Sequence, residues 1–301
     1  MKQIIFLLLV MSSNKLLASD NKSYTCPLDG WTTEQITQFI DNKFTIENQN
    51  LDQLSLSMMG CLASHDPYIR DEVGYMSYVT WLREQKPSES TIRALFNRFT
   101  EQMNQRRNDE HQVYLPFLTL VYAELVRVDR ITPYLTEQEL QRAVTAISSL
   151  LLEADDFRGF DGKIGWRHLV AHSADVTLQL ILNKRLTKSQ HDELLVALYS
   201  KIAPENHSYR FGESKRFVTP IVYSWMAEKH DLTEWQAMLN QLIDPSPFAS
   251  WQDVYKSEAG LHKLHNTRLY LLELYRLVSF NNVDRLNQLE KSVKAALTKL
   301  G

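Results

Sequence analysis

Apolar residues recur at helical spacing along nearly all of the chain after residue 30, and this pattern constrains the fold more than any other feature. Ile36, Phe39 and Ile40, for example, fall on one face of a helix, and similar helical spacing returns in the later segments. No alternating strand pattern with hairpin turns stands out. The pattern predicts helices over residues 33–40, 51–62, 67–82, 92–99, 113–128, 140–152, 166–182, 191–202, 217–227, 235–243, 261–280 and 283–300.

The links between these segments are short, and some carry helix-capping residues. Residues 136–139 and 187–190 resemble capping boxes, in which the first and fourth residues satisfy each other's backbone N–H groups. A dozen short helices with short links predict an all-α single domain, built as an array of antiparallel helix pairs in an α-solenoid or superhelix. Residues 63–72 resemble the corner of HEAT-type repeats, where an Asp-Pro pair turns the chain and an arginine packs against the neighbouring pair.

The first 18 residues have the pattern of a secretory signal peptide. Lys2 precedes an apolar run over residues 4–11, which is too short to cross a membrane, and Ala18 offers a small residue for cleavage. The alternatives are an uncleaved anchor or a buried first helix. We therefore expect a mature chain of residues 19–301 that is periplasmic or secreted and is not an integral membrane protein after cleavage.

Export to an oxidising compartment bears on the state of the two cysteines. In an oxidising compartment Cys26 and Cys61 are expected to form a disulfide, and the alternative is two unrelated cysteines, one of them buried.

Lys and Arg total 33 against 36 Asp and Glu, a formal net charge of −3. This balance argues against non-specific nucleic-acid binding, which needs a clustered basic face. A protein or peptide partner is the leading expectation.

Residues 155–175 hold the densest motif in the chain. Three of the nine glycines fall within seven residues, which indicates a tight turn, and Trp166 is predicted to open the helix that follows. His168, His172 and Asp175 stand at i, i+4 and i+7, so they are predicted to share one helical face. Such a set can hold a divalent metal, act as a proton relay, or form a hydrogen-bonded brace.

If the motif is a site, its three polar side chains should converge on a shared pocket. Arg158 and Trp166 are the expected lining, with Glu213 or Arg216 contributed by a later segment. If it is a brace, we expect Arg158 to bridge to Asp156 or Asp175, or an arginine to lie between His172 and Asp175. A fixed cation there repels a metal ion from the same place.

The motif also resembles that of a bacterial family catalogued as domain of unknown function 2785. The similarity covers about residues 51–243 and includes the Asp-Pro corner near residue 66 and residues 212–216. The chain departs from the usual family pattern at Arg167 and over residues 108–117. The resemblance implies an all-helical fold and a shared polar centre, and it implies no activity. The resembling motif residues are Arg158, Gly159, Phe160, Gly165, Trp166, His168, His172 and Asp175.

The sequence is compatible with three function classes. The first is a binding scaffold, because a solenoid presents a long concave face. The second is a metal-dependent hydrolase with His168, His172 and Asp175 as ligands of a divalent metal and Asp155 or Asp156 as general base. The third gives the motif a purely structural role in a protein that binds a small polar ligand. A weaker metal candidate is His262 with His265, near Glu258.

Overall fold

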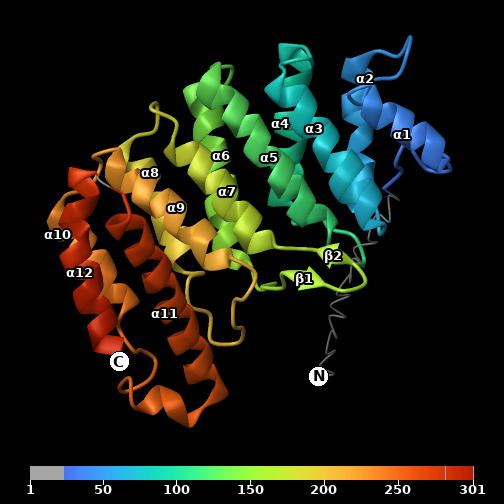
Figure 1. Cartoon of the computed structure of the whole chain (residues 1–301). Helices are drawn as coiled ribbons and strands as arrows, with labels where there is room; N and C mark the ends of the chain where they lie inside the picture. Colours follow the sequence, from blue (N-terminus) through green and yellow to red (C-terminus); the bar gives the residue numbers. More distant parts are fainter. Residues whose placement is uncertain (1–23, 282, 301) are drawn as a thin grey trace, which may run out of the picture.

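The computed structural model describes residues 24–281 and 283–300 and is almost entirely helical (Figure 1). The predicted signal peptide, residues 1–18, lies outside the described residues. The α-helices are α1 (Thr33–Asp41), α2 (Leu51–Ser57), α3 (Met76–Arg83), α4 (Glu89–Asn104), α5 (Tyr114–Ile131), α6 (Glu137–Glu153), α7 (Leu169–Ile181), α8 (Lys188–Tyr199), α9 (Glu213–Met226), α10 (Leu232–Leu242), α11 (Glu258–Ser279) and α12 (Asp284–Leu300). Shorter elements are the 3₁₀ segments η1 (Met58–Ala63) and η3 (Asp253–Lys256), the π-helical segment η2 (Tyr68–Tyr75), and the strands β1 (Phe160–Asp161) and β2 (Gly165–Trp166).

The all-α prediction is confirmed, and each segment predicted from apolar spacing contains a helix. Both predicted capping boxes are present, because the Thr136 and Thr187 hydroxyls accept hydrogen bonds from the N–H groups of Glu139 and Gln190. The prediction that Trp166 opens a helix is wrong. Trp166 ends the β1–β2 hairpin, and α7 begins only at Leu169.

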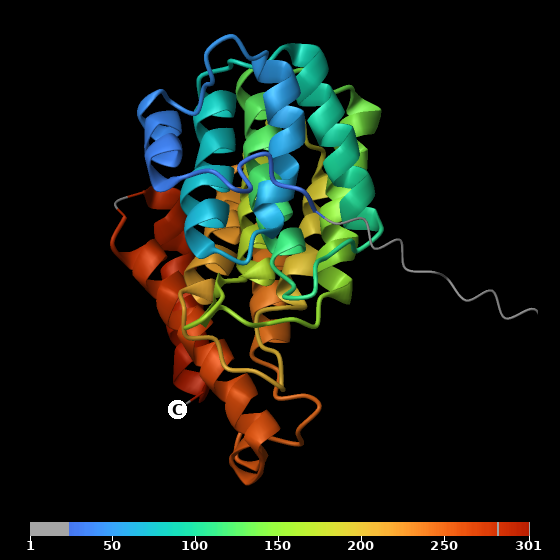
Figure 2. The ribbon, with the colours of Figure 1, turned by 90° about the vertical axis from the view of Figure 1, so that its right-hand side faces the viewer.

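The helices follow one another across the molecule in two rows. One row runs from η2 and α3 through α5, α7 and α9 to α11, and each member packs on the next. Behind it α4, α6 and α8 pack in the same order, and α12 covers α11 and α10. Figure 1 shows this progression from α1 to α12, and in Figure 2 α11 reaches beyond the ends of the earlier helices. Within the described part of the chain, no helix is both long and apolar enough to cross a membrane.

A disulfide fastens the N-terminal segment to the helices. Cys26 and Cys61 are bonded, as predicted, and both are buried. The Thr25 backbone passes close to Gly60, and a Cβ at position 60 would lie 2.0 Å from the Thr25 carbonyl oxygen. A larger residue at position 60 would therefore push the N-terminal segment away from η1. The Tyr24 hydroxyl donates to the Asn108 carbonyl oxygen, which holds the same segment against the α4–α5 link.

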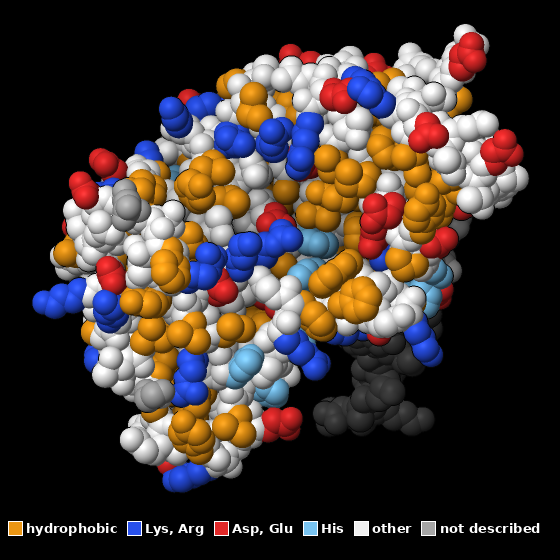
Figure 3. Space-filling model, in the orientation of Figure 1, with side chains coloured by type: hydrophobic (Ala, Val, Ile, Leu, Met, Phe, Trp, Pro, Cys, Tyr) orange, Lys and Arg blue, Asp and Glu red, His pale blue; other side chains and the backbone are white. Residues whose placement is uncertain are grey.

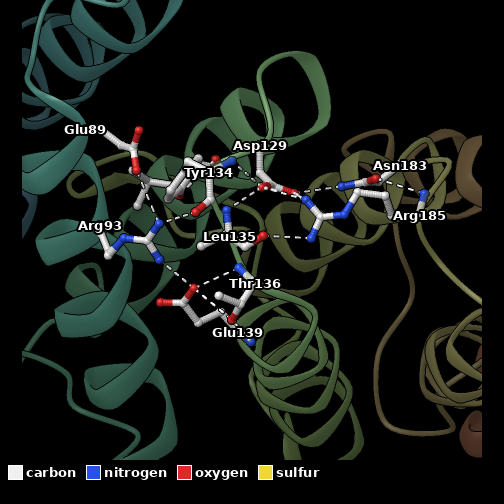
Figure 4. Close-up of polar contacts among 10 residues, drawn as sticks. Glu89, Arg93, Asp129, Tyr134, Leu135, Thr136, Glu139, Asn183 and Arg185 are labelled. Carbon is white, nitrogen blue, oxygen red and sulfur yellow. Dashed lines mark hydrogen bonds and ion pairs between the residues drawn. The ribbon is translucent and has the colours of Figure 1, made fainter.

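A buried carboxylate ties helix links together at the C-terminal end of α5 (Figure 4). Asp129 accepts hydrogen bonds from the N–H groups of Tyr134 and Leu135 at 2.9 and 2.8 Å and from the Asn183 side chain at 2.9 Å. Arg185 pairs with the same carboxylate and donates to the Leu135 carbonyl oxygen. The α5–α6 and α7–α8 links are therefore held to α5 at the end opposite to the N-terminus of α7.

Candidate functional site

The glycine-rich motif folds as a small hairpin before α7. Phe160 pairs with Trp166 in antiparallel strands, and the Asp161 carboxylate accepts hydrogen bonds from the N–H groups of Lys163 and Ile164 in the turn. Gly165 has a φ of +77°, and a Cβ at this position would lie 3.0 Å from Nη2 of Arg70. Both facts favour glycine there, because an L side chain would be strained and crowded.

Arg70 is the buried anchor of this hairpin. Its side chain has no exposed surface, and its guanidinium donates to the carbonyl oxygens of Ser64 at 3.1 Å and Ile164 at 2.8 Å. The guanidinium also pairs with Asp71 and lies over the Phe117 ring, 4.7 Å from its centroid. These contacts explain why an arginine follows the Asp-Pro corner: it joins the start of η2 to a hairpin 94 residues further along the chain.

His168 is held by a carboxylate that comes from α9. The residue lies just before α7 with a left-handed φ of 62°, so the prediction that it shares a helical face with His172 and Asp175 is wrong. Its Nε2 lies 3.0 Å from Oε1 of the fully buried Glu213. Burial opposes ionisation of Glu213, but hydrogen bonds from His168 and the Phe211 N–H outweigh burial and lower its pKa. Glu213 is therefore an ionised acceptor for an N–H of His168.

His172 is a neutral imidazole with a defined tautomer. Its Nδ1 lies 2.9 Å from the Pro116 carbonyl oxygen, which can only accept, so Nδ1 carries the proton. Burial, with a smaller contribution from His168, lowers the pKa of His172 to about 3. Nε2 therefore bears a lone pair at neutral pH, and it accepts no hydrogen bond from the residues that the structure describes. The His168 and His172 rings meet edge to face at 5.8 Å.

Asp175 belongs to an ion pair with Arg216. Burial raises the pKa of Asp175, and Arg216 opposes this shift as its ion-pair partner. Arg158 lies elsewhere: it forms a bidentate pair with Asp156 and also donates to Gln112. Of the two bridges considered for Arg158, the one to Asp156 is found, and the arginine that neutralises Asp175 comes from α9 instead.

Further polar residues surround this centre, and they gave no signal in the sequence. Glu124 on α5 accepts a bidentate pair from Arg83 at 3.0 and 2.6 Å. Burial, with a smaller effect of Glu124, raises the pKa of Tyr75 to about 12, so this phenol stays protonated. These side chains come from α5, α3 and η2 and lie about 30 to 80 positions before the start of the motif. Only the packing of the rows brings them together.

The metal-ligand prediction for His168, His172 and Asp175 finds no support in this geometry. His168 and Asp175 are engaged by Glu213 and Arg216, and a fixed guanidinium disfavours a nearby cation. Among the described residues, one group of His, Cys, Asp or Glu side chains brings three ligand atoms within 4.8 Å of one another. It consists of residues 65, 110 and 111, outside the motif. The brace prediction therefore describes the Asp175 end of the motif better than the metal prediction does.

His168 and His172 are both buried, each with 5% of its surface exposed. On the face that Figure 3 shows, histidine side chains lie in a hollow between hydrophobic side chains, with basic and acidic groups beside them. The hydrophobic rim includes Trp166 and Phe160, which are 37% and 49% exposed although both are large. Trp166 stacks on the His168 ring at 4.8 Å, so the apolar rim and the polar centre are in direct contact.

Comparison with known proteins gives a family and no activity. The family model described as Protein of unknown function (DUF2785) matches residues 66–275. This range contains the Asp-Pro corner, the hairpin, α7 and the start of α9, that is, every part of the polar centre. No protein with curated annotation and no solved structure matches the chain.

Proposed function

Since the chain belongs to the DUF2785 family, whose description states no function, we propose from its own geometry that it is an exported binding protein. Its mature form, residues 19–301, is a single helical domain of the periplasm or cell exterior. It holds a segment of a protein or peptide partner on the face that carries His172 and Trp166. The motif residues act as a preformed recognition centre and as a brace.

The disulfide supports the export part of this proposal. Cys26 and Cys61 account for both cysteines of the chain, and stable disulfides are typical of oxidising compartments. The N-terminal sequence, with its short apolar run and Ala18, fits a cleaved leader that delivers the chain there.

The order of helix packing supports a HEAT-like superhelix. Members of the first row contact their neighbours in chain order, and members of the second row do the same, as expected for stacked helix pairs. Stacked pairs place successive helices of one row on one continuous face. The polar centre lies at one end of this row, where the starts of α5, α7 and α9 meet.

The observation that carries the binding proposal is the unused acceptor of His172. Its Nδ1–H is fixed on the Pro116 carbonyl oxygen and its pKa is about 3, so Nε2 offers a lone pair in one orientation. The exposed Trp166 stacks on His168, whose ring in turn meets that of His172. A preoriented acceptor one ring away from an exposed indole suits a ligand that brings an N–H or O–H donor together with an apolar group. An extended segment of a polypeptide supplies both along its backbone and side chains.

Photo-crosslinking tests this proposal. A benzophenone amino acid replaces Phe160, which is 49% exposed at the rim, and in a control chain it replaces Val196, which is 65% exposed on α8. We expect a discrete adduct at position 160 that is absent at position 196. A synthetic peptide of the crosslinked segment should then bind the purified protein.

The matched variant for that peptide is His172→Asn. The asparagine amide retains a donor for the Pro116 carbonyl oxygen and removes the Nε2 lone pair. Binding should weaken by about tenfold, which corresponds to the loss of one well-placed hydrogen bond. Equal adducts at both positions, or equal peptide affinity for both proteins, would contradict the proposal.

A further inference from the structure

A second group of histidines lies at the surface, beside the β1–β2 hairpin that precedes α7. His65 follows η1, and Glu110 and His111 lie in the link between α4 and α5. Nε2 of His65 and Nε2 of His111 stand 3.7 and 3.6 Å from the same Glu110 carboxylate oxygen. All three ligand-type atoms lie within 4.8 Å of one another.

These separations match those of a tetrahedral zinc site. With bonds of about 2.1 Å, two ligands at the tetrahedral angle are roughly 3.4 Å apart. The two imidazole–carboxylate distances exceed this value by only a few tenths of an ångström. Two imidazoles and a carboxylate are a donor set that zinc and similar divalent transition metals accept, whereas calcium and magnesium prefer oxygen ligands alone.

Both backbone segments that carry the histidines are anchored by arginines. Arg70 donates to the carbonyl oxygen of Ser64, next to His65, and Arg167 donates to that of His111 at 3.0 Å. The His65 and His111 rings meet edge to face with their centroids 3.9 Å apart. The two Nε2 atoms are therefore brought to one place by the fold.

Asp109 fixes the turn that presents Glu110. One oxygen of its carboxylate accepts the N–H groups of Val113 and Tyr114 at the start of α5, and the other accepts the His111 N–H at 2.9 Å. This second oxygen also lies 4.0 Å from Nε2 of His65. Asp109 thus fixes the backbone of the turn that presents Glu110 and His111, and its carboxylate adds negative charge beside the site.

We propose that His65, Glu110 and His111 bind one zinc ion or a similar divalent transition metal, with water in the fourth position. The ion would join the corner after η1 to the α4–α5 link, and so add a crosslink near the one that the disulfide makes. This site is separate from the His172 centre and from the partner binding proposed above.

Calorimetric titration with zinc chloride tests the site. The full chain is purified without a polyhistidine tag and freed of metal with a chelator. We expect one zinc ion per chain, with an affinity that falls by more than about tenfold in His65→Ala and in His111→Ala. Zinc should also raise the melting temperature of the parent protein and leave that of the two variants unchanged. Both histidines are partly exposed, so the variants should fold, and circular dichroism checks this.

Two control variants locate the ion. His262→Ala removes another histidine whose Nε2 lies near a single carboxylate, that of Glu258 at 3.8 Å, and it should bind zinc like the parent. His172→Asn should do the same. The proposal is overturned if the parent protein binds no zinc. It is equally overturned if binding survives in His65→Ala and His111→Ala, or is lost in His172→Asn alone.

Discussion

Individual residues of the polar centre depend on partners that lie far away in the sequence. Glu213 reaches His168 across 45 positions, and it can do so because nothing larger than a hydrogen stands at Gly159. A Cβ at residue 159 would lie 2.3 Å from the Phe211 ring and 3.1 Å from the Glu213 carboxylate. The glycine is thus required by a close approach between the hairpin and the start of α9.

We predict that Gly159→Ala lowers the free energy of unfolding by about 1–3 kcal/mol, the usual cost of forcing a methyl group into a filled space. Gly162→Ala is the control in the same turn, because a Cβ there meets no atom within 4 Å. It should change the free energy by less than about 0.5 kcal/mol. Urea denaturation measures both, and equal effects of the two substitutions would refute the role assigned to Gly159.

At the scale of elements, apolar spacing and capping residues sufficed to predict the helices. The hairpin escaped prediction because each strand has only two residues, too few to show alternation. The left-handed backbone of His168 escaped for a related reason: the hairpin sets it, since the His168 N–H donates to the Arg158 carbonyl oxygen. Spacing alone therefore placed His168 on a helix that begins one residue later.

The candidate site was only partly predictable. Its residues within one motif, such as His172 and Asp175, stand out by composition. Arg216 and Glu213 were proposed as lining residues, but which of them meets which side chain depends on the packing of α9 against α7. His65 and His111 gave no signal of metal binding, because 46 positions separate them and the Asp-Pro corner that contains His65 pointed only to a turn. Only the anchoring by two arginines brings them together.

The disulfide is an element-scale constraint with a measurable effect. It closes a loop with a sequence separation of 35 residues, for which the chain-entropy model gives about 3–4 kcal/mol of stabilisation. We predict that Cys26→Ser/Cys61→Ser lowers the free energy of unfolding by this amount in urea. Reductant should bring the parent protein to the same value and leave the variant unchanged. A parent protein indifferent to reductant would contradict the prediction.

At the scale of the whole molecule, the two rows are fastened at opposite ends of α5 and α7. The Asp129 cluster holds the links at one end, and the polar centre with Arg70 holds the hairpin at the other. Both fastenings bury ionisable groups, so the stability of the whole domain depends on pH. The sign of that dependence follows from His172 and Asp71 at the hairpin end and from His191, which is buried between α8 and α9.

Burial, with a smaller contribution from His168, lowers the pKa of His172 to about 3. Burial, with a smaller contribution from His230, lowers the pKa of His191 to about 4. These rings stay neutral in the folded protein but take up a proton on unfolding below about pH 6.5, so their contribution to stability is lost as the pH falls. Asp71 acts in the opposite sense. Burial raises its pKa to about 6 despite Arg70, so its contribution is present below the unfolded pKa and is lost as the pH rises through 6.

Near pH 5, in the middle of the range from pH 4 to 6, the unfolded chain therefore binds about two more protons on the histidines and about one fewer on Asp71, so acid destabilises the fold. Each proton corresponds to a slope of about 1.4 kcal/mol per pH unit. We predict that His172→Asn flattens the fall in unfolding free energy over this range by about that amount, and that Asp71→Asn steepens it by the same amount. Urea titrations at several pH values measure the slopes. Three parallel lines would show that these buried groups do not control the acid stability of the protein.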